Sequence, residues 1–319
     1  ASLADPEEFA QQVADTTSIL RSRFGVEPKV IRNTELIYDD DLAPQLVAMG
    51  FKGCLTEGAK HILGWKSPNY IYTAASAPKL RLLLRNAKLS DDIAVRFSDT
   101  QWSEFPLTAE KYIDWIASTP MEEQIVNIFL NMETFGDFHP ATTGIFDFLK
   151  ALPRFAAERG VEFLTPTQAI SKIKPVDTLS VMHPISSAGE GRDTSTWLGN
   201  RLQNEAFDKL YAAGERVRKC SNRSLKRDWQ YLQAADHFFY MGQGSMGFSP
   251  YETPYAAFTN YMNVLADFLM RVEEEFPSQV GNEELNSLLT TIANQDTEIE
   301  ELNKQLASLR KDMEQYNIE

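Results

Sequence analysis

The sequence predicts an α/β fold followed by helices. Short apolar runs alternate with amphipathic segments up to about residue 174 of 319, a pattern typical of a β/α barrel or a doubly wound sheet. Beyond that point strand signals disappear and helical patterns follow, which favours a helical bundle. The last segment repeats apolar residues every seven positions, as coiled coils do. The predicted parts are therefore 1–175, 176–278 and 279–319.

The first predicted elements bring two glutamates to one edge of a sheet. A helix is expected over residues 5–23, because Asp-Pro-Glu-Glu is a typical helix start. A short strand at 30–31 is followed by Glu35, and after a helix at 42–49 a second strand ends at Glu57. Strand, helix and strand joined by short connections imply parallel strands. Both glutamates are then expected at the carboxyl-terminal edge.

Two further strands complete the predicted α/β part. They are Lys79–Asn86 and Ile125–Leu130, with helices at 108–117 and 143–160. The apolar fourth strand ends abruptly in a polar stretch, 131–136. Ligands bind at the carboxyl ends of the strands in both architectures, so this stretch is expected to line a pocket.

The rest of the chain is predicted to be helical. Bundle helices are expected at 194–219, 225–241 and 255–275. An apolar heptad pattern runs over 285–316, which predicts a coiled coil that either self-associates or packs on a partner helix. The alternative is one long amphipathic helix folded back on the bundle.

Composition excludes several classes of protein. A net charge of −14 and a pI near 4.9 argue against nucleic-acid binding, whereas a neutral sugar is indifferent to that charge. Cys54 and Cys220 lie far apart, so neither a disulfide framework nor a zinc site is expected, and free thiols favour a cytoplasmic location. No run of 18 apolar residues predicts a membrane span, and the first residues do not resemble a secretion signal. Without a phosphate-binding loop or paired histidines, we expect no cofactor and no metal.

Acids at neighbouring strand ends suit glycoside hydrolysis. One carboxylate attacks or stabilises the anomeric carbon while a second, protonated group supports the leaving oxygen. By position the candidates are Glu35, Glu57 and Glu133. The alternative for each is structural, because acids at strand ends also cap the following helix. Loop aromatics such as Trp65 and Trp197 could stack on pyranose rings.

Longer stretches resemble the α-amylase-like members of glycoside hydrolase family 57. The resemblance runs from residue 1 to about 275 and leaves the heptads outside. Its blocks include "KVIRNTELIYDDDL", "GFKGCLTEGAKHILGWKSPNYIY", "NIFLNMETFGDFHPATTGIFDFLKALP" and "DWQYLQAADHFFYM". The resemblance implies a (β/α)7 barrel followed by a helical domain, activity on α-glucans or maltooligosaccharides, and a retaining mechanism.

The resemblance also implies roles for individual residues. Glu35, in "RNTELIY", falls on the family's catalytic nucleophile, and Asn131 falls on the position of its acid/base Asp. The remaining positions are expected to bind substrate: Glu57, Trp65, Glu133, His139, Trp197, Asp236 and His237.

Two departures from the family pattern change the expected activity. An amide has no ionisable proton near neutral pH, so Asn131 could not protonate the leaving oxygen. The chain also contains no His-Gln-Pro motif, so it resembles an incomplete barrel without the family's first strands. Three readings follow: an amylase or 4-α-glucanotransferase, a noncatalytic relative that binds α-glucan or scaffolds proteins, and a polysaccharide deacetylase-like enzyme. The last lacks the Asp and two His that its metal requires.

Overall fold

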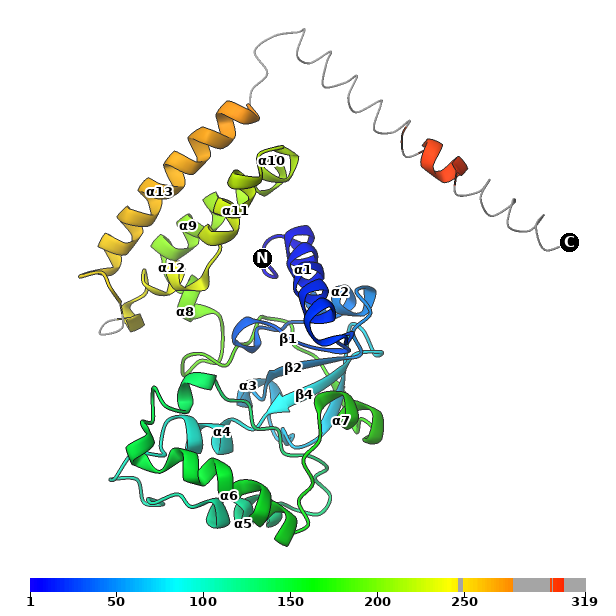
Figure 1. Cartoon of the computed structure of the whole chain (residues 1–319), viewed down its shortest axis with the longest axis vertical. Coiled ribbons are helices and arrows are strands. Elements are labelled where there is room, and N and C mark those ends of the chain that lie inside the picture. The colour runs from blue at the N-terminus through cyan, green and yellow to red at the C-terminus, as the bar shows by residue number, and fades with distance from the viewer. Residues whose placement is uncertain (246–248, 278–298, 300, 307–319) are drawn as a thin grey trace, which may run out of the picture. The chain divides into compact units, whose positions relative to one another are not determined.

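The computed structural model describes residues 1–245, 249–277, 299 and 301–306. The chain divides into two compact units. Figure 1 shows the helices and strands along the chain. One unit comprises Ala1–Gly214 and Gln233–Tyr261 and contains the whole sheet. The other comprises Glu215–Leu232 and the chain from Met262 onward.

A mixed five-stranded sheet organises the first unit, with the strand order β1-β2-β4-β3-β5. The strands are β1 (Val30–Arg32), β2 (Gly53–Glu57), β3 (Ile71–Ala74), β4 (Arg81–Arg85) and β5 (Asp177–Leu179). β1, β2 and β4 run parallel, as the sequence predicted for the first two, while β3 pairs with β4 in the antiparallel sense. The carboxyl ends of three strands therefore meet at one edge of the sheet.

The predicted strand at Ile125–Leu130 is wrong, since this segment is extended but not part of the sheet. Its inner edge is tied to the end of β4: the Asn127 carbonyl accepts from the Asn86 N–H at 2.8 Å. On its outer edge, the main-chain groups of Val126, Ile128 and Leu130 have no hydrogen-bond partner within the described residues. A strand needs a ladder of such bonds on at least one side, and the bonds here are too few.

β3 and β5 were not predicted. β5 begins just past residue 175, where the sequence change was placed, and pairs in parallel with β3. Both strands are short, at four and three residues, so they carry little periodic signal.

Apolar side chains cover both faces of the sheet. On one face, Leu82 and Leu84 pack in a cluster with Phe9 of α1 (Pro6–Phe24) and Leu46 of α2 (Leu42–Ala48). On the other, Leu83 packs with residues of β3 and of α7 (Pro166–Lys172). Because successive residues of a strand point to opposite faces, the Leu-Leu-Leu run of β4 supplies both cores.

Helices make up most of the remaining described chain. They are α1 (Pro6–Phe24), α2 (Leu42–Ala48), α3 (Lys60–Leu63), α4 (Ala87–Ala94), α5 (Ala109–Ala117), α6 (Ile145–Glu158), α7 (Pro166–Lys172), α8 (Ser195–Leu198), α9 (Arg201–Ala212), α10 (Gly214–Lys219), α11 (Arg223–Leu232), α12 (Ala235–Phe239) and α13 (Pro254–Glu275). Short 3-10 turns are η1 (Thr34–Leu36), η2 (Met132–Thr134), η3 (Ala141–Thr143) and η4 (Gln243–Ser245).

Two of the predicted bundle helices are broken into shorter ones. The segment 194–219 forms α8, α9 and α10, and 225–241 falls within α11 and α12. The first break has a local cause: Asn200 and Gln203 form a capping box that starts α9 anew.

Most of the heptad segment, 279–319, lies outside the described residues. Within it, residues 299 and 301–306 are helical, and Ile299, Leu302 and Leu306 are exposed. Among the helices that the structure describes, none combines the length and the apolar character needed to cross a bilayer.

The sheet core should be sensitive to a cavity at Leu84, which is 0% exposed in β4. We expect Leu84→Ala to lower the free energy of unfolding by about 2–5 kcal/mol, through lost burial and an unfilled cavity. Leu149→Ala is the matched control, because Leu149 is 42% exposed on α6, and should change it by only about 0.5 kcal/mol. Urea unfolding measures both, and equal losses would contradict this core assignment.

Candidate active site

Polar and charged side chains gather where β1, β2 and β4 end. Glu35 lies in η1 directly after β1, Glu57 is the last residue of β2, and Arg85 is the last residue of β4. Glu57 and Arg85 are register partners in the parallel pair. The hydroxyl of Thr56 in β2 donates to the Leu36 carbonyl at 3.1 Å, which joins the η1 turn to the sheet. Glu35 and Glu57 thus lie at the same edge of the sheet, as predicted.

Glu35 lies in a strained turn. Its φ and ψ are 48° and 30°, and Leu36 follows with φ 57°, so two consecutive side-chain-bearing residues are left-handed. Such conformations cost about 1–3 kcal/mol each and cluster at functional sites. The turn is held from outside, because the Glu35 carbonyl accepts from both the N–H and the Oγ of Ser187, at 2.8 and 3.1 Å.

The side chain of Glu35 is also held by Ser187. The Ser187 hydroxyl also lies 3.0 Å from Oε2 of Glu35, so its one proton is shared between the carbonyl and the carboxylate of Glu35. Glu35 remains partly exposed. This arrangement orients a carboxylate at the sheet edge while leaving it accessible to a ligand.

A chain of ion pairs runs beside Glu35. Arg85 Nη1 lies 3.2 Å from the carboxylate of Glu57, and its Nη2 pairs with Asp91 of α4. Asp91 also binds Arg192 Nη2 at 2.9 Å, and Arg192 donates to the Ser187 carbonyl. Through Ser187, Glu35 is therefore connected to a series of alternating acidic and basic groups. This series ends at the buried carboxyl ends of β2 and β4.

Of the two acids in this series of ion pairs, Glu57 is the more buried, at 1% exposure. Desolvation by burial raises the pKa of its carboxyl, opposed by the charges of Arg85 and Arg192. Its Oε1 is buried and has no hydrogen-bond partner within the described residues. A buried carboxylate with one unsatisfied oxygen depends strongly on its arginine.

Asn131 lies directly after the extended 125–130 segment and is exposed. Its Oδ1 accepts from Arg32 Nη2 of β1 at 3.4 Å. Arg32 is three residues before Glu35, so Asn131 lies beside the strand that leads into the turn holding Glu35. The amide at this position faces a guanidinium.

The structure does not bring all predicted site residues into this edge. Glu133 in η2 is exposed, and Trp65, after α3, is 91% exposed. His139 is 4% exposed, with its Nε2 3.1 Å from the Ala94 carbonyl and its Nδ1 2.7 Å from Ser98 Oγ. A carbonyl only accepts, so Nε2 carries the proton and Nδ1 accepts from Ser98. His139 thus has both ring nitrogens occupied by protein groups.

The other predicted binding residues lie farther along the chain. Trp197 in α8 is half-buried. Asp236 is exposed in α12, and the neighbouring His237 packs its ring against Tyr261 with centroids 5.2 Å apart. They belong to the same unit as Glu35.

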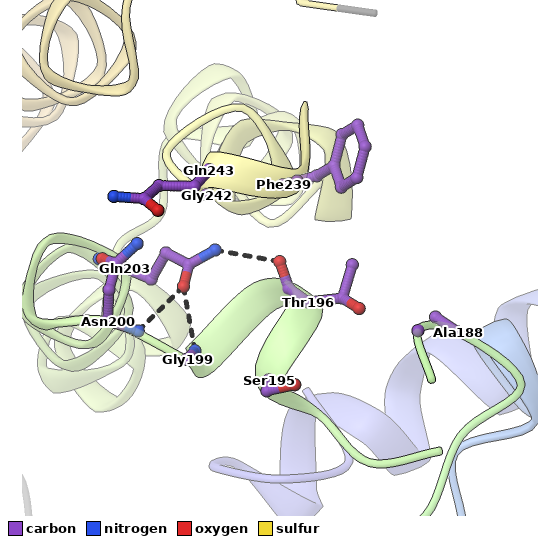
Figure 2. A pocket seen from close by; sticks show the side chains of 11 residues that line it. Ala188, Ser195, Thr196, Gly199, Asn200, Gln203, Phe239, Gly242 and Gln243 are labelled. Carbon is purple, nitrogen blue, oxygen red and sulfur yellow. Dashed lines mark hydrogen bonds between the residues drawn. The ribbon is translucent and has the colours of Figure 1, made fainter. Parts of the chain in front are cut away.

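A hollow of about 520 Å³ is lined by Ala188 and by residues of α8, α9 and α12 (Figure 2). It begins at Ala188, next in sequence to Ser187. At its base Gln203 donates to the Thr196 carbonyl and accepts from the N–H groups of Gly199 and Asn200, at 2.9, 2.9 and 3.0 Å. The lining residues are Ala188, Gly189, Ser195, Thr196, Gly199, Asn200, Gln203, Phe239, Gly242, Gln243 and Gly244. Phe239 offers the one aromatic ring among these residues.

Within the described parts of the chain, no cluster of three or more His, Cys, Asp or Glu side chains is placed to hold a metal ion. The described cysteines, Cys54 and Cys220, are free and buried, and burial raises the pKa of both thiols.

Sequence reasoning missed four residues of the site: Arg85, Asp91, Ser187 and Arg192. Arg85 could have been found, because it ends a predicted strand just as Glu57 does. Ser187 and Arg192 lie in a Gly- and Ser-rich stretch whose sequence predicts only a loop. Loops carry functional residues without periodic signal, so only tertiary structure reveals them.

Two solved structures have a fold similar to that of this chain. A GH57-type branching enzyme from Pyrococcus horikoshii superimposes with a TM-score of 0.63 at 16% identity, covering 86% of this chain and 66% of the enzyme. A 4-alpha-glucanotransferase from Thermococcus litoralis superimposes with a TM-score of 0.62 at 14% identity, covering 85% and 45%. At such identities the likeness concerns the fold.

Sequence comparison defines the family. The model of glycosyl hydrolase family 57 matches residues 1–182. A protein of Methanocaldococcus jannaschii described as "Putative alpha-amylase" is 38% identical over 286 residues, which cover 84% of this chain and 60% of that protein. The chain belongs to glycosyl hydrolase family 57, as its sequence blocks predicted. It spans less than two thirds of the length of this relative.

Burial of Glu57 gives a pH test. Its pKa in the folded protein is raised above the ordinary 4.5, so the folded protein holds the Glu57 proton more tightly than the unfolded chain does. The contribution of this proton to stability is complete below about pH 4.5 and is lost as pH rises through the folded-state pKa. In urea unfolding from pH 4 to 8, the stability of wild type relative to Glu57→Gln should fall as pH rises. Glu57→Gln also loses the ion pair with Arg85, which changes the stability difference between the two proteins at every pH. Only the change of that difference with pH therefore tests the raised pKa. Parallel curves would contradict the raised pKa.

Proposed function

We propose that this protein acts on α-1,4-linked glucans by a retaining mechanism in which Glu35 is the nucleophile. The supporting observation is the accessible Glu35 carboxylate, fixed by Ser187 in a strained turn at the carboxyl ends of parallel strands. Membership of glycosyl hydrolase family 57 supports the reaction class, and the names of the similar structures support α-glucan as substrate.

In this proposal Glu35 attacks the anomeric carbon and the bond to the leaving oxygen breaks, which forms a glycosyl ester on Glu35 while the leaving oxygen takes its proton from water. The oxygen of water or of a sugar hydroxyl then bonds to the anomeric carbon, the ester bond to Glu35 breaks, and the proton of that acceptor passes to solvent. Asn131 occupies the acid/base position and can hydrogen-bond the leaving oxygen without protonating it. Missing acid assistance costs about a hundred- to ten-thousand-fold. Natural glucans should therefore turn over slowly.

Asn131 also favours a second candidate function, the binding of α-glucan without efficient turnover. Both candidates require maltooligosaccharide to bind, with Glu57, Trp65, Glu133, His139, Trp197, Asp236 and His237 as the binding residues proposed from the family resemblance. Calorimetry with maltoheptaose distinguishes them from a scaffold without ligand, since the absence of heat and of turnover would reject both.

The barrel, the helical bundle and the cellular location are also proposed. We infer that the strands β1 to β4 are part of an incomplete TIM-like (β/α)7 barrel over 1–175, followed by a helical bundle over 176–278. The fold likeness to the branching enzyme and the parallel run of β1, β2 and β4 support this inference. The cytoplasmic location and the exclusion of nucleic acid remain predictions from composition.

A substrate whose leaving group needs no proton tests nucleophilic attack by Glu35 separately from acid assistance at Asn131. We expect wild type to cleave α-maltosyl fluoride readily and maltoheptaose poorly, because fluoride departs without acid help. Asn131→Asp should raise turnover of maltoheptaose by about a hundred- to ten-thousand-fold and change the fluoride reaction far less. Glu35→Gln should abolish both reactions. Reducing-sugar release and fluoride release are the measurements.

The matched control is Asn204→Asp, which adds the same charge on the exposed face of α9. Arg32 lies 3.4 Å from Oδ1 of Asn131 and would favour an ionised Asp there, so the double variant Asn131→Asp, Arg32→Gln should exceed Asn131→Asp on maltoheptaose. An active Glu35→Gln protein would refute the nucleophile assignment.

We also propose self-association through the heptads at 285–316. Light scattering of the chain with and without residues 281–319 measures this directly. The full chain should form a dimer or higher oligomer and the shortened chain a monomer, because coiled coils bury a/d residues between helices. If the full and the shortened chain form particles with the same number of chains, self-association through this segment is rejected.

A further inference from the structure

The segment that holds Glu35 is a small hairpin over residues 185–193, which begins just beyond the part matched by the family model, 1–182. Ile185 pairs with Asp193 across it, and the Ser186 N–H donates to the Arg192 carbonyl at 3.1 Å. Ile185 also pairs with Tyr38, exchanging two main-chain hydrogen bonds of 3.0 and 3.2 Å. The hairpin is therefore pinned to the chain three residues after Glu35.

The hairpin presents Ser187 to Glu35 in three ways. Its N–H donates to the Glu35 carbonyl, and its one hydroxyl proton is shared between that carbonyl at 3.1 Å and the Glu35 carboxylate at 3.0 Å. The first two contacts stabilise a left-handed main chain. The third restricts the side-chain torsions of Glu35, which would otherwise rotate freely at a partly exposed position.

Arg192 holds the hairpin from the opposite side. Its guanidinium donates to the Ser187 carbonyl and pairs with Asp91, which Arg85 ties to Glu57. Arg192 itself is left-handed, with φ 51°, a conformation that a side-chain-bearing residue adopts only when its surroundings fix it. The arginine thus links the position of Ser187 to the buried sheet edge.

We propose that Ser187 and Arg192 are positioning residues for the nucleophile: Ser187 orients the Glu35 carboxylate, and Arg192 fixes Ser187 against Asp91. This inference rests on the proposed function. Glu35 attacks one carbon along one direction, so loss of orientation lowers the rate of the covalent step more than it weakens glucan binding.

The reading as a merely structural contact predicts a different outcome. If the hairpin only stabilised the fold, removal of the Ser187 hydroxyl would lower stability and leave turnover per folded molecule unchanged. The measurement must therefore report kcat and KM separately, together with the urea midpoint.

The experiment uses α-maltosyl fluoride, whose cleavage needs no acid. Ser187→Ala should lower kcat about tenfold or more, the loss expected for one hydrogen bond to a charged group, with KM and the urea midpoint nearly unchanged. Ser187→Thr retains the hydroxyl and should recover most of kcat. Arg192→Gln should lower kcat in the same direction as Ser187→Ala, and their combination should cost less than the product of the two losses, because both act through one contact.

The matched control is Ser180→Ala, which removes a serine hydroxyl that donates to the carboxylate of Asp40 at 2.8 Å. It should leave kcat on the fluoride unchanged. A wild-type rate in Ser187→Ala would overturn the positioning role while the proposed function stands. A wild-type protein that neither cleaves the fluoride nor forms a glycosyl ester would overturn the proposed function and the positioning role together.

Discussion

The buried ion pair between Glu57 and Arg85 is the interaction on which the rest of the site depends. Arg85 reaches three separate segments: Glu57 of β2, Asp91 of α4 and, through Nε at 3.1 Å, the Phe129 carbonyl of the extended segment. A guanidinium can do this because its five N–H donors lie in one rigid plane. Without it, the Glu57 carboxylate would be left buried and unpaired, which typically costs 3–5 kcal/mol.

From this pair the order of the site extends outward to Glu35. The contacts run outward from the buried pair toward solvent: Arg85 binds Asp91, Asp91 binds Arg192, and Arg192 binds the half-buried Ser187. The left-handed Glu35 and Leu36 cost about 1–3 kcal/mol each, and single neutral hydrogen bonds return about 0.5–1.5 kcal/mol. The turn therefore persists only because several bonds act on it together, from β2 and from the hairpin.

The sequence predicted the part of the site that obeys a simple rule. Acids that follow short apolar runs in a strand, helix, strand order must lie at one sheet edge, so Glu35 and Glu57 were found. The segment 125–130 has the apolar run of a strand, yet whether it joins a sheet depends on which partners border it, which no local pattern encodes. Ser187 and Arg192 were beyond prediction for the same reason, since their contacts join residues about 100 to 150 positions apart.

Asn131 limits the chemistry available at a site where Glu35 is already well positioned. The fold provides a carboxylate with a fixed orientation, and in the proposed mechanism that carboxylate attacks a sugar. At the position that the proposed mechanism assigns to the acid/base, however, an amide faces Arg32, and an amide has no proton to give to a leaving oxygen near neutral pH. Under that mechanism the rate of bond cleavage depends on the leaving group itself. The site that we propose would therefore bind a glucan better than it cleaves one.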